Sequence, residues 1–279
     1  MLFNYLLSVL FFALMGTGLG QIVNGSTLDN PTAGPPASEF AGGSTMSLAI
    51  LQSEVAKVSK PALEGTYPVH SGGNAAQVTI YSDWAGFRKG AAFVFVADMD
   101  VDCDGLDWQC EGNQDGQPIT DFGALSAYAV PFIVVPNRFG VKYKDVLPGN
   151  NVAAVICNGK MFYGIYGDTN FGSPQNIGEA SWLMARTCFP NDNLNGNRGH
   201  VETDVTYIVF TGSDAVLPGS ALNEHYITDF ATLRSMGDKL ISSLAKSLQL
   251  VAAKTTRPTA RPATTFSTVV VPASPTAHA

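Results

Sequence analysis

The sequence predicts a mainly β protein of the α+β class, a β-barrel with two or three peripheral helices. Short segments combine alternating or continuous apolar character with β-branched and aromatic residues, and turns rich in Gly and Asn separate them. These segments are residues 76–81, 92–96, 128–135, 152–156, 161–166 and 205–210. Strands at such spacings favour a barrel or a sandwich over a wound α/β sheet.

Three segments have helical character. A short helix over residues 46–58 must stop before Pro61. A second helix is expected over residues 178–187, and a third begins after Thr228 or Asp229, either of which can cap it. The third helix has apolar side chains at helical spacing on one face, which indicates core packing. These side chains are Phe230, Leu233, Leu240, Leu244, Leu248 and Val251.

Composition divides the chain into four parts. Residues 1–20 contain a short apolar run followed by small residues, which is typical of a secretory signal peptide, although the segment has no Lys or Arg. Residues 21–61 are expected to form a flexible leader that includes the short helix. Residues 62–254 suffice for one domain with a substantial core, and the Thr/Pro-rich residues 255–279 are expected to be disordered. We therefore expect a secreted, extracellular protein.

The cysteines predict two disulfide bonds. Four cysteines in an exported chain allow three pairings. We favour Cys103 with Cys110, which closes a short loop, and Cys157 with Cys188, which brackets the acidic pair described below. The sequon at Asn24 predicts N-glycosylation just after the expected cleavage site.

Charge and motifs exclude several classes of function. The formal net charge is −7, whereas nucleic-acid binding needs a basic footprint. An acidic surface suits a cationic substrate, but it also serves solubility. The motifs G-x-S-x-G, H-E-x-x-H and the P-loop do not occur, which argues against a serine hydrolase or a zinc protease. We expect a monomer without nucleic-acid or membrane partners.

Two acidic residues stand out as a candidate catalytic pair. Asp168 ends an expected strand, and Glu179 follows 11 residues later in the first turn of an expected helix. Glycosidic cleavage needs one carboxylic acid to protonate the leaving oxygen and one carboxylate to activate water or attack carbon. Tyr163, Tyr166 and Trp182 are near in sequence and could stack on sugar rings. The structural alternative is an Asx turn at Asp168 and a helix cap at Glu179.

Four blocks of sequence follow one another in order. Residues 96–105 read VADMDVDCDG, residues 167–170 read GDTN, residues 178–181 read GEAS and residues 194–200 read LNGNRGH. Together they resemble the fungal chitosanases of glycoside hydrolase family 75, over roughly residues 68–210. The resemblance implies inverting, endo-acting hydrolysis of β-1,4-linked glucosamine in chitosan, without a cofactor.

The resemblance also implies that Asp168 and Glu179 are the catalytic pair. A Glu in the first turn of a helix tends to stay ionised, which favours Glu179 as the base. The expected substrate contacts are Asp98, Asp100, Asp102, Tyr166, Asn170 and Trp182. The Gly-Asp-Thr strand end with its Gly-Glu turn is also similar to the double-psi barrels of some cellulases and lytic transglycosylases.

Other interpretations stay open. Asp100, Asp102, Asp104 and Glu111 fit the calcium-loop pattern D-x-D-x-D-G-x5-E, although a strand precedes them and Asp107 replaces the usual aliphatic residue. An acidic rim that binds glucosamine ammonium groups is the interpretation we favour, without a bound metal, and a solvated turn is the third. For the whole protein, the alternatives are a non-catalytic carbohydrate-binding protein and a hydrolase of another β-1,4 glycan.

Overall fold

The computed structural model describes residues 24–43 and 46–250. Both the expected signal peptide and the Thr/Pro-rich tail lie outside the described residues. The strands are β1 (Pro61–Pro68), β2 (Gln77–Tyr81), β3 (Ala92–Asp102), β4 (Phe132–Pro136), β5 (Val152–Cys157), β6 (Lys160–Asn170), β7 (Glu179–Ser181) and β8 (His200–Phe210). The α-helices are α1 (Leu48–Val55), α2 (Asn137–Lys142), α3 (Trp182–Cys188) and α4 (Phe230–Ser247).

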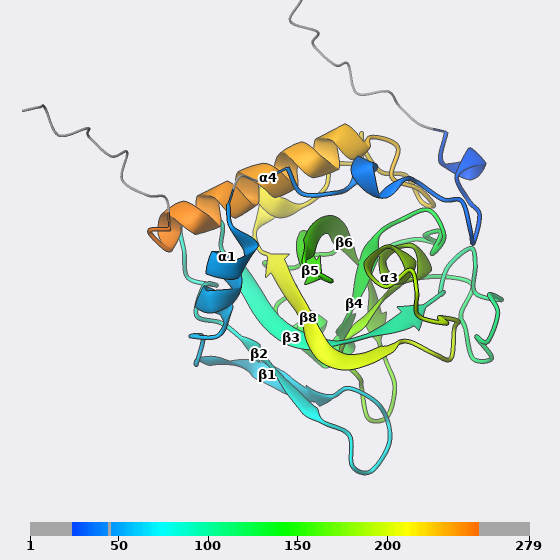
Figure 1. The fold of residues 1–279 in the computed structure, drawn as a ribbon, viewed down its shortest axis with the longest axis horizontal. Helices are drawn as coiled ribbons and strands as arrows, with labels where there is room; N and C mark the ends of the chain where they lie inside the picture. The colour runs from blue at the N-terminus through cyan, green and yellow to red at the C-terminus, as the bar shows by residue number, and fades with distance from the viewer. Residues whose placement is uncertain (1–23, 44–45, 251–279) are drawn as a thin grey trace, which may run out of the picture.

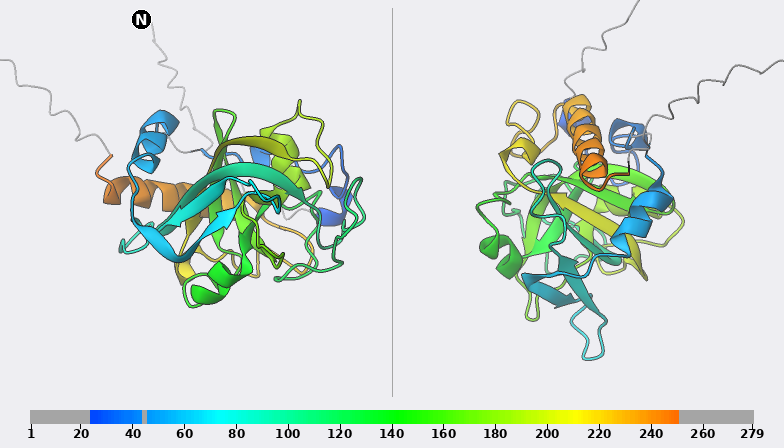
Figure 2. Two further views of the ribbon diagram at one scale, coloured as in Figure 1. Left: turned by 90° about the horizontal axis from the view of Figure 1, so that it is seen from below. Right: turned by 90° about the vertical axis from the view of Figure 1, so that its left-hand side faces the viewer.

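Six strands close a barrel in the order β3-β7-β4-β6-β5-β8, because β8 pairs back with β3. The pairs β3–β7 and β4–β6 are parallel, and the other pairs in the ring are antiparallel. β1 and β2 continue the sheet beyond β3 as a hairpin that projects from the barrel (Figures 1 and 2). The mainly β barrel predicted from sequence is thus confirmed.

Helix α4 lies across one side of the barrel (Figure 1). It covers the outer face of neighbouring strands, whose sequences are therefore continuous apolar runs. Every residue of β5 is buried, as expected for a strand that is covered on both faces. Gly237 of α4 lies directly against the ring of Tyr163 on β6, where a Cβ would come within 2.4 Å of the ring. The Tyr163 hydroxyl donates to Asp238 at 2.7 Å. Tyr163 is therefore a core residue and cannot stack on a sugar.

The described residues before β1 pack on the domain. Phe40 is fully buried between Phe162 and Phe230, with ring centroids 5.7 and 6.3 Å away. The Gly42 amide donates to the carbonyl of Met161 at 2.8 Å. This segment, expected to be a flexible leader, therefore adds apolar contacts beneath α4.

The favoured disulfide pairing is confirmed, because Cys103 bonds to Cys110 and Cys157 to Cys188. Helix α2 and strands β1 and β7 were not predicted. Among the described residues, no helix is both long and apolar enough to cross a membrane.

Candidate active site

The two candidate catalytic acids lie on opposite sides of the same residue of β4. Val134 pairs with Asp168 of β6 on one side and with Glu179 of β7 on the other. The two acids are two strands apart, so their backbones are about 10 Å from each other. Because residues directly opposite one another point to the same face of a sheet, both acid side chains share a face with Val134. The barrel therefore presents both carboxylates toward one pocket.

A β-bulge directs Asp168 into this pocket. Between β4 and β6 the register shifts: Ile133 pairs with Tyr166, but the next residue, Val134, pairs with Asp168. The extra residue is Gly167, where a Cβ would lie 2.6 Å from Phe132 Cβ. Because a one-residue shift exchanges the two faces of a strand, Tyr166 and Asp168 point to opposite sides.

Asp168 is 5 % exposed, and backbone amides hold its carboxyl group. Its Oδ1 accepts from the amide of Asp121 at 2.9 Å and from the amide of Thr169 at 2.8 Å. The Thr169 hydroxyl in turn donates to Asp121. Among the described residues Oδ2 accepts no hydrogen bond, so it is the oxygen free to carry a proton.

Glu179 is held from the other side by an amide side chain. Nδ2 of Asn170 lies 3.0 Å from each carboxylate oxygen of Glu179, while its Oδ1 accepts from the amides of Gly172 and Asn176, each at 3.0 Å. Asn170 thus orients Glu179 and ties it to the loop that follows β6. Asn170 was expected to contact substrate, and it does line the acidic pocket described below.

The expected location of Glu179 in a helix is wrong. It begins strand β7, and α3 starts three residues later, where Ser181 caps it by accepting from the amide of Met184 at 3.3 Å. Gly178 has a φ of +100°, and a Cβ there would lie 2.2 Å from Asp98 Oδ1, so only glycine fits before Glu179. The helix-dipole argument for an ionised Glu179 therefore does not apply.

Two further carboxylates face the pair at the end of β3. Carboxylate oxygens of Asp102, Asp104 and Asp168 all lie within 4.8 Å of one another. The Asp104 amide donates to Asp102 Oδ1 at 2.7 Å, and Asp104 Oδ1 accepts from the Gln117 amide at 2.8 Å. Such a cluster attracts a cation, which could be a substrate ammonium group or a divalent metal ion.

Burial and mutual repulsion raise the pKa values of these carboxyls. Burial raises the pKa of Asp168 to about 9 and that of Glu179 to about 8, and the charge of Asp102 adds to both shifts. The hydrogen bond from Asn170 opposes the shift at Glu179. Burial, with the charge of Asp104, raises the pKa of Asp102 to about 7. These carboxyl groups therefore bind protons more tightly than exposed ones, and a cation near them is stabilised.

The calcium-loop pattern is only partly realised. Asp102 and Asp104 converge, but the third carboxylate of their cluster is Asp168 rather than Asp100 or Glu111. The cluster can supply three oxygen ligands, and the same oxygens fit an ammonium group.

These acids surround a pocket of about 310 Å³. Its lining includes five carboxylates, from Asp102, Asp104, Asp115, Asp168 and Glu179. Other lining residues include Gln117, Thr169, Asn170, Phe171 and Gly172. Sequence reasoning missed Asp115, Gln117 and Phe171, which lie in loops. Phe171 is 64 % exposed, an unusual position for a phenyl ring and a signal of a contact surface.

Four residues expected to bind substrate do not line this pocket. Asp98 is 5 % exposed, and burial together with the charge of Asp100 raises its pKa to about 8. Asp100 is half-buried beside Gly199, where a Cβ would lie 2.4 Å from its Oδ1. The remaining two are Tyr166 and Trp182.

Both aromatic side chains are engaged elsewhere. Tyr166 is 1 % exposed and packs edge-on against Phe122, with ring centroids 4.9 Å apart. Trp182 donates from Nε1 to the carbonyl of Pro31 at 3.0 Å and packs against Tyr128, with ring centroids 5.6 Å apart. Neither ring is placed to stack on a sugar in the pocket.

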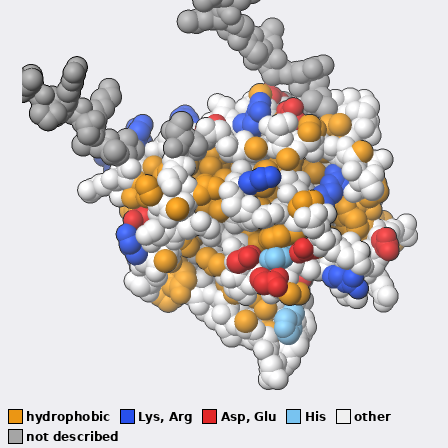
Figure 3. All heavy atoms as spheres, viewed as in Figure 1, with side chains coloured by type: hydrophobic (Ala, Val, Ile, Leu, Met, Phe, Trp, Pro, Cys, Tyr) orange, Lys and Arg blue, Asp and Glu red, His pale blue; other side chains and the backbone are white. Residues whose placement is uncertain are grey.

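His200 from the last sequence block is a structural residue on β8. Its ring stacks on Phe189 at 3.5 Å, and its nitrogens contact Asp192 at 2.8 Å, Asp204 at 3.1 Å and Glu202 at 3.5 Å. On the face shown in Figure 3, acidic side chains gather around a histidine.

A protonatable acid and an oriented carboxylate that face each other across an acidic pocket define the type of site used by glycoside hydrolases. The sequence matches the family described as fungal chitosanase of glycosyl hydrolase group 75 over residues 99–243. That match covers just over half of the chain, and the chain belongs to this family.

Individual relatives agree. Endo-chitosanase C of Aspergillus oryzae is 61% identical over 241 residues, which are 86% of this chain and 63% of the relative. Endo-chitosanase B of the same fungus is 38% identical over 186 residues, 58% of this chain and 77% of the relative. An endo-chitosanase of Aspergillus fumigatus is 38% identical over 197 residues, 62% of this chain and 80% of the relative. The chain thus spans less than two thirds of endo-chitosanase C.

Proposed function

We propose that this protein is a secreted endo-chitosanase that hydrolyses β-1,4-linked glucosamine by an inverting mechanism. The observation that carries the proposal is the placement of Asp168 and Glu179 on either side of Val134, at the edge of a pocket lined by five carboxylates. Chitosan is a cationic glycan, and the negative charge of the ionised carboxylates in this pocket attracts it. The two disulfides support an extracellular location.

Asp168 acts as the general acid. Its pKa is raised to about 9, so the carboxyl group is protonated near neutral pH. Because two backbone amides occupy Oδ1, the proton resides on Oδ2 and is delivered to the glycosidic oxygen as the bond to the anomeric carbon breaks.

Glu179 acts as the general base. Its pKa, raised to about 8, owes part of the shift to the charge of Asp102. A glucosamine ammonium group bound between Asp102 and Asp104 offsets that charge, which favours ionised Glu179. The carboxylate of Glu179 then takes a proton from the attacking water, while the oxygen of that water forms a bond to the anomeric carbon.

Spacing supports inversion. A water molecule fits between carboxyl groups that are roughly 6.5–9.5 Å apart, whereas direct attack needs about 5–5.5 Å. Residues two strands apart have backbones about 10 Å apart, which leaves room for a water molecule between side chains that point into one pocket.

The viscosity of a chitosan solution tests the proposal. Wild-type protein should collapse the viscosity, because internal cuts shorten the chains quickly. Asp168→Asn and Glu179→Gln should each lose at least ~10²-fold in rate while they still fold and bind chitosan. A binding protein, the rival in another class, would leave viscosity unchanged in every case. Fully active Asp168→Asn protein would remove that residue from the mechanism.

A further inference from the structure

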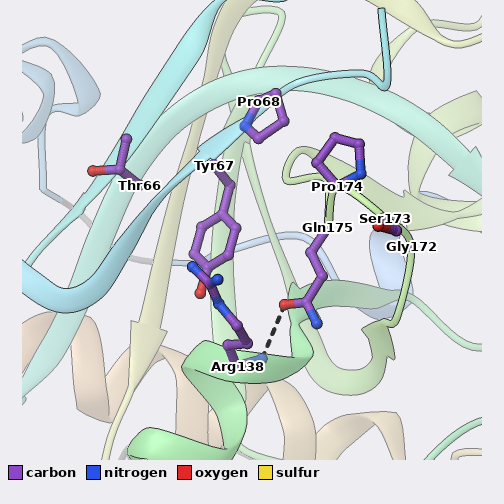
Figure 4. Close-up of a pocket in the computed structure, with 8 residues that line it drawn as sticks. All are labelled: Thr66, Tyr67, Pro68, Arg138, Gly172, Ser173, Pro174 and Gln175. Atoms are coloured by element: carbon purple, nitrogen blue, oxygen red, sulfur yellow. Dashed lines mark hydrogen bonds between the residues drawn. The ribbon is translucent and has the colours of Figure 1, made fainter.

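A second pocket adjoins the acidic one and differs from it in electrostatic character. Its volume is about 350 Å³, and the two pockets meet at Gly172, which lines both. Figure 4 shows its walls: the end of β1 with Tyr67 and Pro68, the loop with Pro174 and Gln175, and Arg138 of α2.

The lining of this second pocket contains no carboxylate. Its residues are Thr66, Tyr67, Pro68, Arg138, Gly172, Ser173, Pro174 and Gln175. The one charged group among them is the guanidinium of Arg138, which lies 5.7 Å from the centre of the Tyr67 ring. Glu64 pairs with this guanidinium at 3.1 Å, so the surroundings are close to neutral, in contrast to the five carboxylates next door.

The uncharged groups can bind a neutral polar ligand. Gln175 accepts from the Arg138 amide at 3.0 Å through Oε1, as Figure 4 shows, and among the described residues its Nε2 makes no hydrogen bond. Gln175 Nε2 and the guanidinium can therefore donate to a carbonyl oxygen. Pro68 and Pro174 add apolar surface above them (Figure 4).

A sugar chain can pass from one pocket to the other. Phe171 lines the acidic pocket and is 64 % exposed, and Gly172 beside it is exposed and has no side chain to block the passage. An exposed aromatic ring offers a flat apolar face on which a pyranose can stack.

We propose that the second pocket is a subsite for an N-acetylated, uncharged sugar unit of the substrate. This inference rests on the proposed function. A glucosamine ammonium group loses hydration there and finds no carboxylate in the lining to replace it, whereas an acetamido group meets donors for its carbonyl oxygen and proline surface for its methyl group. The acidic pocket then holds glucosamine, and the second pocket selects cleavage sites at a fixed distance from an acetylated unit.

Sequencing of early products from partially acetylated chitosan tests this inference. Wild-type products should carry N-acetylglucosamine enriched at one fixed position relative to the cut. Arg138→Glu should reduce that enrichment by about threefold or more, because the change turns a nearly neutral ion pair with Glu64 into two carboxylates that attract an ammonium group. Ser173→Asp adds a carboxylate at the exposed rim without removing a contact and should act in the same direction.

The matched control is Arg88→Glu, which makes the same charge change in a separate groove near α4 and should keep the wild-type pattern. Wild-type products with N-acetylglucosamine at random positions relative to the cut would contradict the subsite. An enrichment that stays unchanged in both folded variants, Arg138→Glu and Ser173→Asp, would contradict it as well. Assays on fully deacetylated chitosan separate the two proposals. A wild-type protein that is inactive on this polymer and on the acetylated one contradicts the proposed chitosanase activity. A wild-type protein that is active but shows no positional preference on the acetylated polymer contradicts only the subsite.

Discussion

The side-chain amide of Asn170 spans both carboxylate oxygens of Glu179, with Nδ2 at 3.0 Å from each. Through its Oδ1 the same side chain holds the loop after β6. One residue thus fixes the orientation of the proposed base and the wall of the acidic pocket.

Asn170→Ala should lower kcat by about 10-fold or more and change KM little, since a hydrogen bond to a charged group contributes about 1.5–3 kcal/mol. Steady-state kinetics on chitosan measure this split. Asn176→Ala is the matched control, because Asn176 lies in the same loop and its side chain bonds to Ser71 at 3.3 Å rather than to Glu179. Equal losses in both variants would mean that loop structure, not orientation of Glu179, is what matters.

Asp102→Asn should move the whole pH profile of kcat/KM to lower pH. The charge of Asp102 contributes to the raised pKa of both Asp168 and Glu179, and removing a negative neighbour favours the ionised forms. Glu179 then loses its proton at lower pH, and so does Asp168, so both limbs shift in the same direction. The exposed Asp145→Asn variant serves as control. A profile that stays in place or moves to higher pH contradicts this electrostatic account.

The cluster of Asp102, Asp104 and Asp168 should serve substrate rather than a structural metal. A chelator should then leave the melting temperature unchanged, and Asp104→Asn should raise KM for chitosan. A metal ion at a free concentration of 100 times its Kd would add about 2.7 kcal/mol to the free energy of unfolding. That gain is enough to shift the melting temperature by several degrees. A drop of that size on chelation, reversed by Ca²⁺, would identify a metal site instead.

Buried Asp98 should reduce stability as the pH rises. Its pKa is raised to about 8, and its Oδ1 has no hydrogen-bond partner among the described residues. Above pH ~4 the unfolded chain ionises this group while the folded protein keeps it protonated, so the contribution of Asp98 to the free energy of unfolding falls by up to about 1.4 kcal/mol per pH unit until the pH approaches the folded pKa. Asp98→Asn removes this loss.

Thermal unfolding at pH 5 and pH 8 measures the difference. The gain in melting temperature from Asp98→Asn over wild type should be larger at pH 8. Asp145→Asn, at an exposed carboxylate, provides the comparison. A gain that is the same at both pH values would mean that Asp98 has an ordinary pKa in the folded protein.

The barrel strands could be predicted because burial on both faces leaves continuous apolar runs, as in β5. Strand β7 could not, because its three residues, Glu179 to Ser181, have no strand pattern and are extended only through pairing with β3 and β4. The helical assignment of Glu179 failed for this reason.

The acidic pair could be found from sequence, but its aromatic neighbours could not be placed. Tyr166 and Asp168 are two residues apart and would share a face of a regular strand. The bulge at Gly167 turns Tyr166 into the core, and only the register with β4 reveals it. Phe171 lies in a loop without periodicity, so its exposure became visible only in three dimensions.

The anomeric configuration of the first products tests the central claim most directly. If Asp168 donates a proton and Glu179 activates a water between them, a single displacement at the anomeric carbon converts the β-linkage to an α-hemiacetal. NMR recorded during early hydrolysis of chitosan should therefore show α-anomers at the new reducing ends before mutarotation, without transglycosylation products. Early β-anomers would show retention through a covalent intermediate, and they would contradict the proposed roles of Asp168 as acid and Glu179 as base.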